Sequence, residues 1–245
     1  MSYCLAIYTK LGLVLASDSR TNAGLDQANV ARKLYTFVKP GERVFVLLTS
    51  GGLSLSQSVL ALLQSDYNAG YGLANVATMY DAARCVGEAV RAVAARDRQF
   101  LERDNIGFNV NFLVGGQIDQ QPHELYLIYP QGNPLQATPD CPFLQIGESK
   151  YGRPILDRAV KYDGTSLEQA TKLALISLDS TMRSNLTVGP PIDLAVYHAN
   201  ELRLRQQIRL SADDPQLLAI RTQWEQELRS ASQRLPVIQF PGEYS

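Results

Sequence analysis

Hydrophobic and polar residues follow strand-like and helix-like patterns in separate blocks along the chain. Residues 4–9 and 13–17 are short apolar runs separated by a polar turn with Gly12, which predicts a β-hairpin at the start. Further β-rich segments, bounded by polar or glycine-rich turns, are predicted at 43–49, 109–114, 124–129, 192–197 and 202–208.

Between these strands the spacing of apolar residues predicts two pairs of helices. The first pair covers residues 55–63 and 77–103. In the longer helix one stripe is apolar and faces a sheet, and it consists of Met79, Ala82, Val86, Val90 and Val93. The second pair comprises a short helix at 151–160 and a helix that begins at the capping-box sequence Thr165-Ser-Leu-Glu168 and ends near Leu178.

The order of these elements predicts the fold class. Strands, two helices, strands, two helices and strands follow one another along the chain. Two sheets packed face to face, with a helix pair outside each, would bury every apolar face. We therefore predict an α+β protein with a four-layer αββα sandwich.

The last segment predicts one more helix, beginning at Asp213-Asp-Pro215. Its apolar residues share one face, and they are Leu217, Leu218, Trp224 and Leu228. Such a face either docks on its own domain or contacts another subunit. We predict one domain over residues 1–245, with 211–245 as a C-terminal helical extension.

Composition narrows the class of protein. The 245 residues are 45% hydrophobic and 19% charged, which allows a large buried core. A net charge of −1 gives no basic footprint for nucleic acid or an anionic membrane surface. No apolar run approaches the roughly 20 residues of a spanning helix, and the start does not match a secretory signal. We expect a cytoplasmic protein without nucleic-acid or membrane partners.

Cofactor chemistry is not indicated by the sequence. No glycine-rich phosphate loop followed by Lys and Ser or Thr is present. Cys4, Cys85 and Cys141 are too few and too scattered for a disulfide framework or a zinc cluster. We expect no metal and no organic cofactor.

The candidate chemistry lies at the start of the chain, in Ser2, Asp18, Arg20 and Lys33. If an aminopeptidase removes Met1, Ser2 carries both a hydroxyl nucleophile and a free α-amine that serves as its base. An α-amine titrates at about 7.7–8.0, so a nearby Lys33 cation would keep it neutral and basic. Asp18, with Arg20 close by, is the candidate for holding Lys33 in position.

The initial hairpin followed by Asp18-Ser-Arg20 and Lys33 resembles the proteasome β-type subunits, a family of N-terminal-nucleophile hydrolases. Within that superfamily the chain is most similar to the bacterial Anbu ("ancestral β subunit") branch. The similarity to Anbu rests on the direct Met1-Ser2 start, on Asp179-Ser-Thr-Met-Arg-Ser-Asn185 and on Val188-Gly-Pro-Pro191. It covers roughly residues 2 to 210.

The resemblance implies further site residues around Ser2. Gly51 matches the glycine whose backbone N–H stabilises the oxyanion of the tetrahedral intermediate. The residues that would line the substrate cleft are Thr21, Thr49 and Ser50. Asp179 and Ser184, with Asn185, match a loop that hydrogen-bonds toward the terminal residue, although loop residues of this type also bond their own backbone.

A second implied contact comes from the segment around residue 149. Relatives often carry a Gly-Ser-Gly run whose serine contacts the catalytic centre, and here Ser149 or Glu148 is in that place. A Glu148 carboxylate close to Ser2 would raise the pKa of the amine and oppose Lys33. The sequence leaves both assignments open.

Two departures from the family pattern accompany these matches. The nucleophile is Ser and not the usual Thr, so its side chain is less restricted, and Lys33 arrives one residue early. We predict amide-bond hydrolysis of a peptide or protein through an acyl-enzyme ester, in a homo-oligomeric assembly of the bacterial cytoplasm. Two alternatives remain open, a non-peptidase amidohydrolase and a catalytically silent scaffold that binds a partner. Whether an unfoldase partner exists is not indicated.

Overall fold

Two five-stranded antiparallel sheets form the centre of the protein. The computed structural model describes residues 2–22 and 28–238. The first sheet has the order β10-β1-β2-β11-β12, and its strands are β1 (Tyr3–Thr9), β2 (Gly12–Ser17), β10 (Phe143–Gly147), β11 (Ile192–His198) and β12 (Gln206–Leu210). The second has the order β5-β6-β7-β8-β9, and its strands are β5 (Leu34–Lys39), β6 (Arg43–Gly51), β7 (Val110–Ile118), β8 (Glu124–Ile128) and β9 (Pro134–Gln136). A short hairpin of β3 (Arg20–Asn22) and β4 (Ala28–Val30) lies apart from both.

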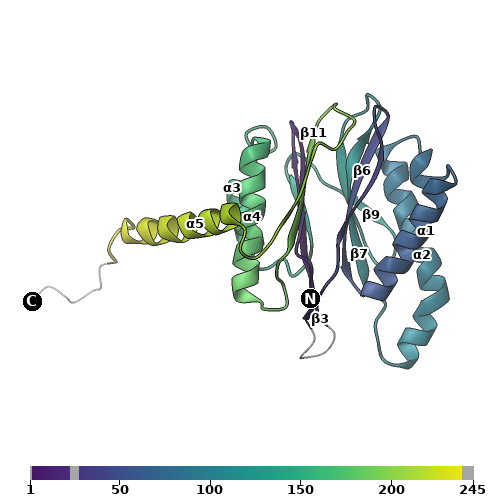
Figure 1. The fold of residues 1–245 in the computed structure, drawn as a ribbon, viewed down its shortest axis with the longest axis horizontal. Helices are drawn as coiled ribbons and strands as arrows, with labels where there is room; N and C mark the ends of the chain where they lie inside the picture. The colour runs from purple at the N-terminus through teal and green to yellow at the C-terminus, as the bar shows by residue number, and fades with distance from the viewer. Residues whose placement is uncertain (1, 23–27, 239–245) are drawn as a thin grey trace, which may run out of the picture.

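Helices cover the outer face of each sheet (Figure 1). The helices α1 (Leu53–Asn68) and α2 (Met79–Arg103), joined through the 3₁₀ turn η1 (Gly72–Ala74), pack on the second sheet. The helices α3 (Arg153–Ala159) and α4 (Leu167–Ser184) lie on the first. The predicted α+β fold with a four-layer αββα sandwich is therefore confirmed.

The alternation of side chains along β1 explains how three core layers arise. Tyr3, Leu5 and Ile7 point toward α4, whereas Cys4 and Ala6 point toward the second sheet. The second sheet in turn buries Phe45 and Leu47 against α1 and α2. Because both faces of the central strands are covered, these strands are apolar at nearly every position.

Helices occur in each segment where the sequence predicts one, but their first and last residues differ from the predicted ones. All residues of the predicted α2 stripe are buried, and Thr78 with Asp81 forms a capping box that starts this helix. In α4 the capping box is Ser166 with Gln169, one residue later than predicted. Thr165 instead accepts a hydrogen bond from the Lys161 N–H at 2.8 Å, which closes the preceding turn.

Two strand predictions need correction. The strand β5 was missed because only Leu34 and Phe37 in it are buried, so its sequence lacks a regular alternation. The predicted strand 202–208 is β12, which starts at Gln206. Asn200 and Leu202 have positive φ angles of 67° and 47°, so this stretch is a turn and not part of the strand.

The helix α5 (Pro215–Gln233) projects from α4 away from the sandwich (Figure 1). The Asp214 carboxylate caps its first turn by accepting from the N–H groups of Gln216 and Leu217. Leu217 is buried, but Leu218 and Leu228 are 40% and 50% exposed, so this subunit covers only part of the predicted apolar face. The end of the predicted extension, residues 239–245, lies outside the described residues.

Across the described ranges, no helix combines the length and apolar character needed to cross a bilayer.

Candidate active site

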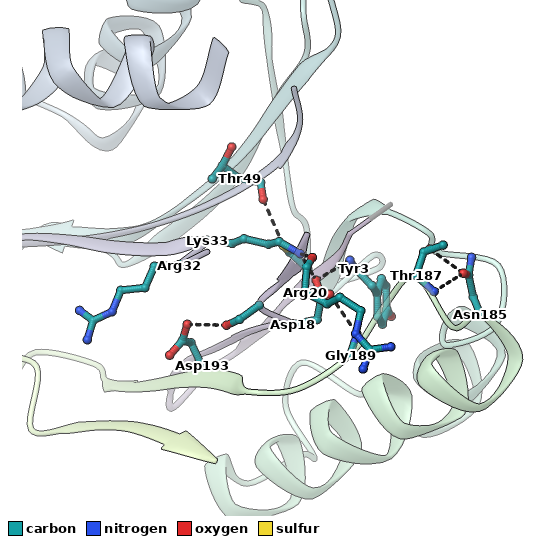
Figure 2. A network of polar contacts seen from close by, with 12 residues as sticks. Tyr3, Asp18, Arg20, Arg32, Lys33, Thr49, Asn185, Thr187, Gly189 and Asp193 are labelled. Carbon is teal, nitrogen blue, oxygen red and sulfur yellow. Dashed lines mark hydrogen bonds and ion pairs between the residues drawn. The ribbon is translucent and has the colours of Figure 1, made fainter. Parts of the chain in front are cut away.

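A buried ion pair lies where the ends of β2 and β5 meet. Asp18 directly follows β2 and Lys33 directly precedes β5. The Lys33 Nζ lies 2.6 Å from Asp18 Oδ1 and also donates to the Arg20 carbonyl at 2.7 Å. The side chains are 4% and 0% exposed, and Figure 2 shows them converging beside Tyr3.

The Asp18 carboxylate also holds the chain immediately after Ser2. Its Oδ1 accepts from the Tyr3 N–H at 3.0 Å, and its Oδ2 accepts from the Gly189 N–H at 3.2 Å. The Asp18 N–H in turn donates to the Tyr3 carbonyl at 3.1 Å. Burial raises the pKa of Asp18, and the Lys33 ammonium followed by these backbone N–H groups opposes that rise. Asp18 thus joins Lys33 to the N-terminal strand.

Arg20 is held by the segment 186–189. Its Nη1 donates to the Leu186 carbonyl at 2.6 Å, and its backbone N–H donates to the Gly189 carbonyl at 3.2 Å. A Cβ at Gly189 would lie 2.6 Å from Arg20 Cζ, so a side chain there would displace the guanidinium. The sequence indicates Val188-Gly-Pro-Pro191 only as a family match, and this role of Gly189 depends on a contact with the distant Arg20.

The structure brings Ser2 to the same place. Ser2 is half-buried, and its carbonyl accepts from the Glu148 N–H at 2.8 Å. The next residue, Tyr3, is fully buried, and its hydroxyl is hydrogen-bonded to Ser177 Oγ at 2.7 Å and to the Gln145 side chain. Burial raises the pKa of Tyr3 to about 12, so the phenol stays neutral. Tyr3 thus anchors the terminal strand, a role that no local signal in the sequence indicates.

The predicted oxyanion and cleft residues lie at the end of β6 and on β3. Gly51 has φ of +106°, and a Cβ there would overlap the Asn109 carbonyl oxygen, so the position requires glycine. The Thr49 N–H donates to the Lys33 carbonyl at 3.0 Å, which places the end of β6 beside the ion pair. Thr49 and Ser50 are buried, whereas Thr21 is half-buried.

Asp179 and Ser184 lie in the helix α4 and not in the predicted loop. The helix α4 continues past the predicted end near Leu178 to Ser184, which is exposed. The buried Asp179 carboxylate binds Arg221 Nε at 2.5 Å and Arg183 Nε at 3.3 Å. The loop begins at Asn185, and its later residues make the contacts to Asp18 and Arg20.

The two candidate residues after β10, Glu148 and Ser149, make different contacts. The Ser149 backbone bonds to Gly147 and Arg153, whereas Glu148 bonds to Ser2. The Glu148 carboxylate accepts from Asn185 Nδ2 at 2.9 Å and lies 3.7 Å from Lys150 Nζ. Of these two residues, Glu148 has the direct contact with the terminal strand.

No group of three or more His, Cys, Asp or Glu side chains suited to a metal occurs among residues 2–22 and 28–238. The site consists of an ion pair, backbone amides and hydroxyl groups.

Comparisons with known proteins identify the class to which this fold and site belong. The model of the family described as "Proteasome subunit" matches residues 2–197. The chain is 26% identical over 193 residues to a "Proteasome subunit beta" of Haloferax volcanii, covering 78% of this chain and 71% of that protein. It is 26% identical over 207 residues to a "Proteasome subunit beta 2" of Pyrobaculum calidifontis, covering 81% and 90%. The chain belongs to the proteasome subunit family.

Similarity to solved structures identifies the branch of the proteasome subunit family to which the chain belongs. An Anbu (ancestral beta-subunit) from Yersinia bercovieri is 46% identical with a TM-score of 0.91, covering 97% of this chain and 99% of that one. The structure described as "Helical Assembly of the Anbu Complex" from Pseudomonas aeruginosa is 52% identical with a TM-score of 0.92, covering 99% and 100%. A Gly-1 mutant of Anbu from Hyphomicrobium sp. strain MC1 is 42% identical with a TM-score of 0.92, covering 98% and 100%. Within the proteasome subunit family the chain falls in the Anbu branch, as the sequence predicted.

Proposed function

We propose that this protein is a hydrolase that cleaves amide bonds with Ser2 as its N-terminal nucleophile, after removal of Met1. The observation that carries the proposal is the position of the Lys33–Asp18 ion pair. Asp18 bonds to Lys33 and to the Tyr3 N–H, one residue from the proposed nucleophile. Membership of the proteasome subunit family, matched over residues 2–197, supports the same chemistry.

The proposed reaction has two steps. The Ser2 Oγ attacks the substrate carbonyl while its proton passes to the Ser2 α-amine, and the Gly51 N–H stabilises the oxyanion. The C–N bond then breaks, and the protonated amine gives its proton to the leaving nitrogen. Water attacks the resulting ester with the same amine as base, which restores the serine hydroxyl and releases the acid.

Lys33 and Asp18 prepare the nucleophile in this mechanism. A cation beside Ser2 favours the neutral form of the amine, which is the form that accepts a proton. Asp18 fixes Lys33 by the 2.6 Å contact and fixes the terminal strand through Tyr3. Arg20, bound to Leu186, supports the segment 185–189 on which Gly189 reaches Asp18.

Intact-mass analysis of the assembled protein with a peptide epoxyketone tests this proposal. The epoxyketone reacts with a hydroxyl and a free amine on one residue, so we expect a chain without Met1 that gains the inhibitor mass. Ser2→Ala should abolish the gain, and Ser58→Ala, which changes an exposed serine on α1, should keep it as a matched control. A chain that has a free Ser2 amine and still refuses the reagent contradicts the proposal and favours the scaffold alternative.

We further propose that the protein works as a homo-oligomer in the bacterial cytoplasm, with residues 211–245 as an extension of a single domain. The Pseudomonas aeruginosa relative is described as a helical assembly. Here α5 presents Leu218 and Leu228 outside the body of the subunit, which suits a contact with a second copy. A panel of peptides and small amides would separate a peptidase from a non-peptidase amidohydrolase.

A further inference from the structure

Glu148 lies directly opposite Ser2, and the mechanism above gives it no role. The register of β1 and β10 pairs Tyr3 with Gly147. The Tyr8 N–H to Pro142 carbonyl bond at one end and the Glu148 N–H to Ser2 carbonyl bond at the other, both 2.8 Å, fit this same register. Residues that lie opposite one another in antiparallel strands have Cβ atoms about 4.5–5.5 Å apart. The Glu148 side chain is therefore within reach of the Ser2 main chain.

The Glu148 side chain is largely buried, but its negative charge has only a weak cationic partner. Its side chain is 10% exposed, and its cation, Lys150 Nζ, is 3.7 Å away on a side chain that is 67% exposed. Its other contact is the neutral Asn185 amide at 2.9 Å. A carboxylate has about four acceptor sites and is costly to bury without a strong partner. Asp18, by contrast, has Lys33 and two backbone N–H groups.

The other charged groups around the terminus have partners of their own. Lys33 is paired with Asp18, and Arg20 is bound to the Leu186 carbonyl. The segment 185–189 contributes amide, hydroxyl and backbone groups, which do not ionise. On α4, Asp179 and Arg183 are paired with each other and with residues of α5.

We propose that Glu148 binds the α-ammonium group that removal of Met1 creates on Ser2, and thereby acts as a positioning residue for that amine. The inference rests on the proposed function only in requiring a free Ser2 terminus. A carboxylate within about 4–6 Å favours the protonated amine, in opposition to Lys33. The protonated amine is not a base, so Glu148 raises the pH at which the amine can activate the Ser2 hydroxyl.

Titration of the terminal amine tests this without any hydrolytic activity. The full chain is prepared with Ser2 as its first residue, confirmed by intact mass. It is then labelled with limiting acetic anhydride from about pH 6 to 10, a range that brackets the ordinary amine pKa. Mass spectrometry of the N-terminal peptide gives the midpoint of labelling. We expect the wild-type midpoint to lie above that of a chain that lacks the Glu148 carboxylate.

Three variants define the outcome. Glu148→Gln keeps the size and removes the charge, and should lower the midpoint by about 1 pH unit. Glu148→Asp keeps the charge, so its midpoint should lie closer to that of the wild type than to that of Glu148→Gln. Glu168→Gln, which removes a carboxylate with 78% exposure at the far end of α4, should leave the midpoint unchanged.

Equal midpoints for Glu148→Gln and Glu168→Gln would overturn the inference. If Glu148→Gln does not fold by circular dichroism, Glu148→Ala takes its place, and equal midpoints for Glu148→Ala and Glu168→Gln overturn the inference in the same way. A chain that refuses the epoxyketone but shows the Glu148-dependent shift would contradict the proposed function and support this inference.

Discussion

Because Gly152 has no Cβ, it leaves room for the Tyr3 side chain next to the terminal residue. The Tyr3 hydroxyl is hydrogen-bonded to Ser177 Oγ at 2.7 Å, and Ser177 donates to the Gly152 carbonyl at 3.0 Å. A Cβ on Gly152 would overlap Ser177 Oγ and lie 2.5 Å from the Tyr3 hydroxyl. This contact connects the residue next to Ser2 with the start of α3 and with α4.

Gly152→Ala is therefore expected to destabilise the protein. The added methyl group must displace Tyr3 or Ser177, and overpacking of this kind costs about 1–3 kcal/mol. Urea unfolding followed by circular dichroism measures the loss. Gly107→Ala is the matched control, because nothing lies within 4 Å of a Cβ at that position. Equal unfolding free energies for the two variants would contradict the packing argument.

At the scale of elements, the helix α5 is attached to α4 through one buried carboxylate. The Asp179 oxygens bind Arg221 on α5 and Arg183 on α4, and Arg183 also contacts Glu225 on α5. Leu217 and the partly buried Ile220 add an apolar contact at the beginning of α5. The helix projects from the body of the subunit (Figure 1), so these contacts set its direction.

Asp179→Asn should loosen α5 while leaving the sandwich intact. The neutral amide loses the charge that holds two arginines, and breaking a buried pair on one side costs about 3–5 kcal/mol when both charges are fully buried. Arg221 is 29% exposed, so a smaller loss is expected here. Hydrogen exchange should become faster in residues 215–233 and stay unchanged in β1 and β2.

Asp157→Asn is the control for this experiment, since Asp157 forms an exposed pair with Arg153 on α3. If α5 exchanges at the same rate in both variants, Asp179 is not its attachment point.

At the scale of the whole molecule, α5 and the residues after it carry several apolar side chains that a lone subunit leaves uncovered. Leu218 and Leu228 are exposed, and the residues after the helix add Leu235, Val237 and Ile238, which are 69% to 91% exposed. Exposed apolar side chains gathered on one segment are typical of a contact between proteins. Its place on a projecting helix favours a neighbouring subunit as the partner.

A Leu218→Ser and Leu228→Ser double variant should weaken the assembly. Burial of a leucine contributes about 1.5–3 kcal/mol, and each 1.4 kcal/mol changes a dissociation constant about tenfold. Light scattering coupled to size exclusion should show a smaller mass at the same protein concentration. Ile106→Ser changes another exposed residue, 54% exposed beside α2, and should not alter the mass. An unchanged mass in the double variant would exclude α5 as the contact.

Local patterns in the sequence were sufficient to predict the layers of the fold and part of the candidate site. The alternation in β1 and β2 and the stripe of α2 are properties of neighbouring residues, and they reflect which face is covered. Asp18 and Lys33 were placed together by a family motif, and their 2.6 Å contact follows from the ends of β2 and β5. The end of α4 was missed because Asp179-Ser-Thr resembles a helix terminus, although all three residues are helical.

Contacts between distant parts of the chain required the tertiary structure. Gly189 reaches Asp18 across 171 residues, and Tyr3 reaches Ser177 across 174. The pairing of β1 with β10 decides that Glu148, and not Ser149, bonds to Ser2. Hydrophobic periodicity reports only whether a side chain is covered, whereas the partner that covers it depends on the path of the whole chain. The proposed nucleophile Ser2 could thus be recognised from the sequence, but the residues that surround it were set by the fold.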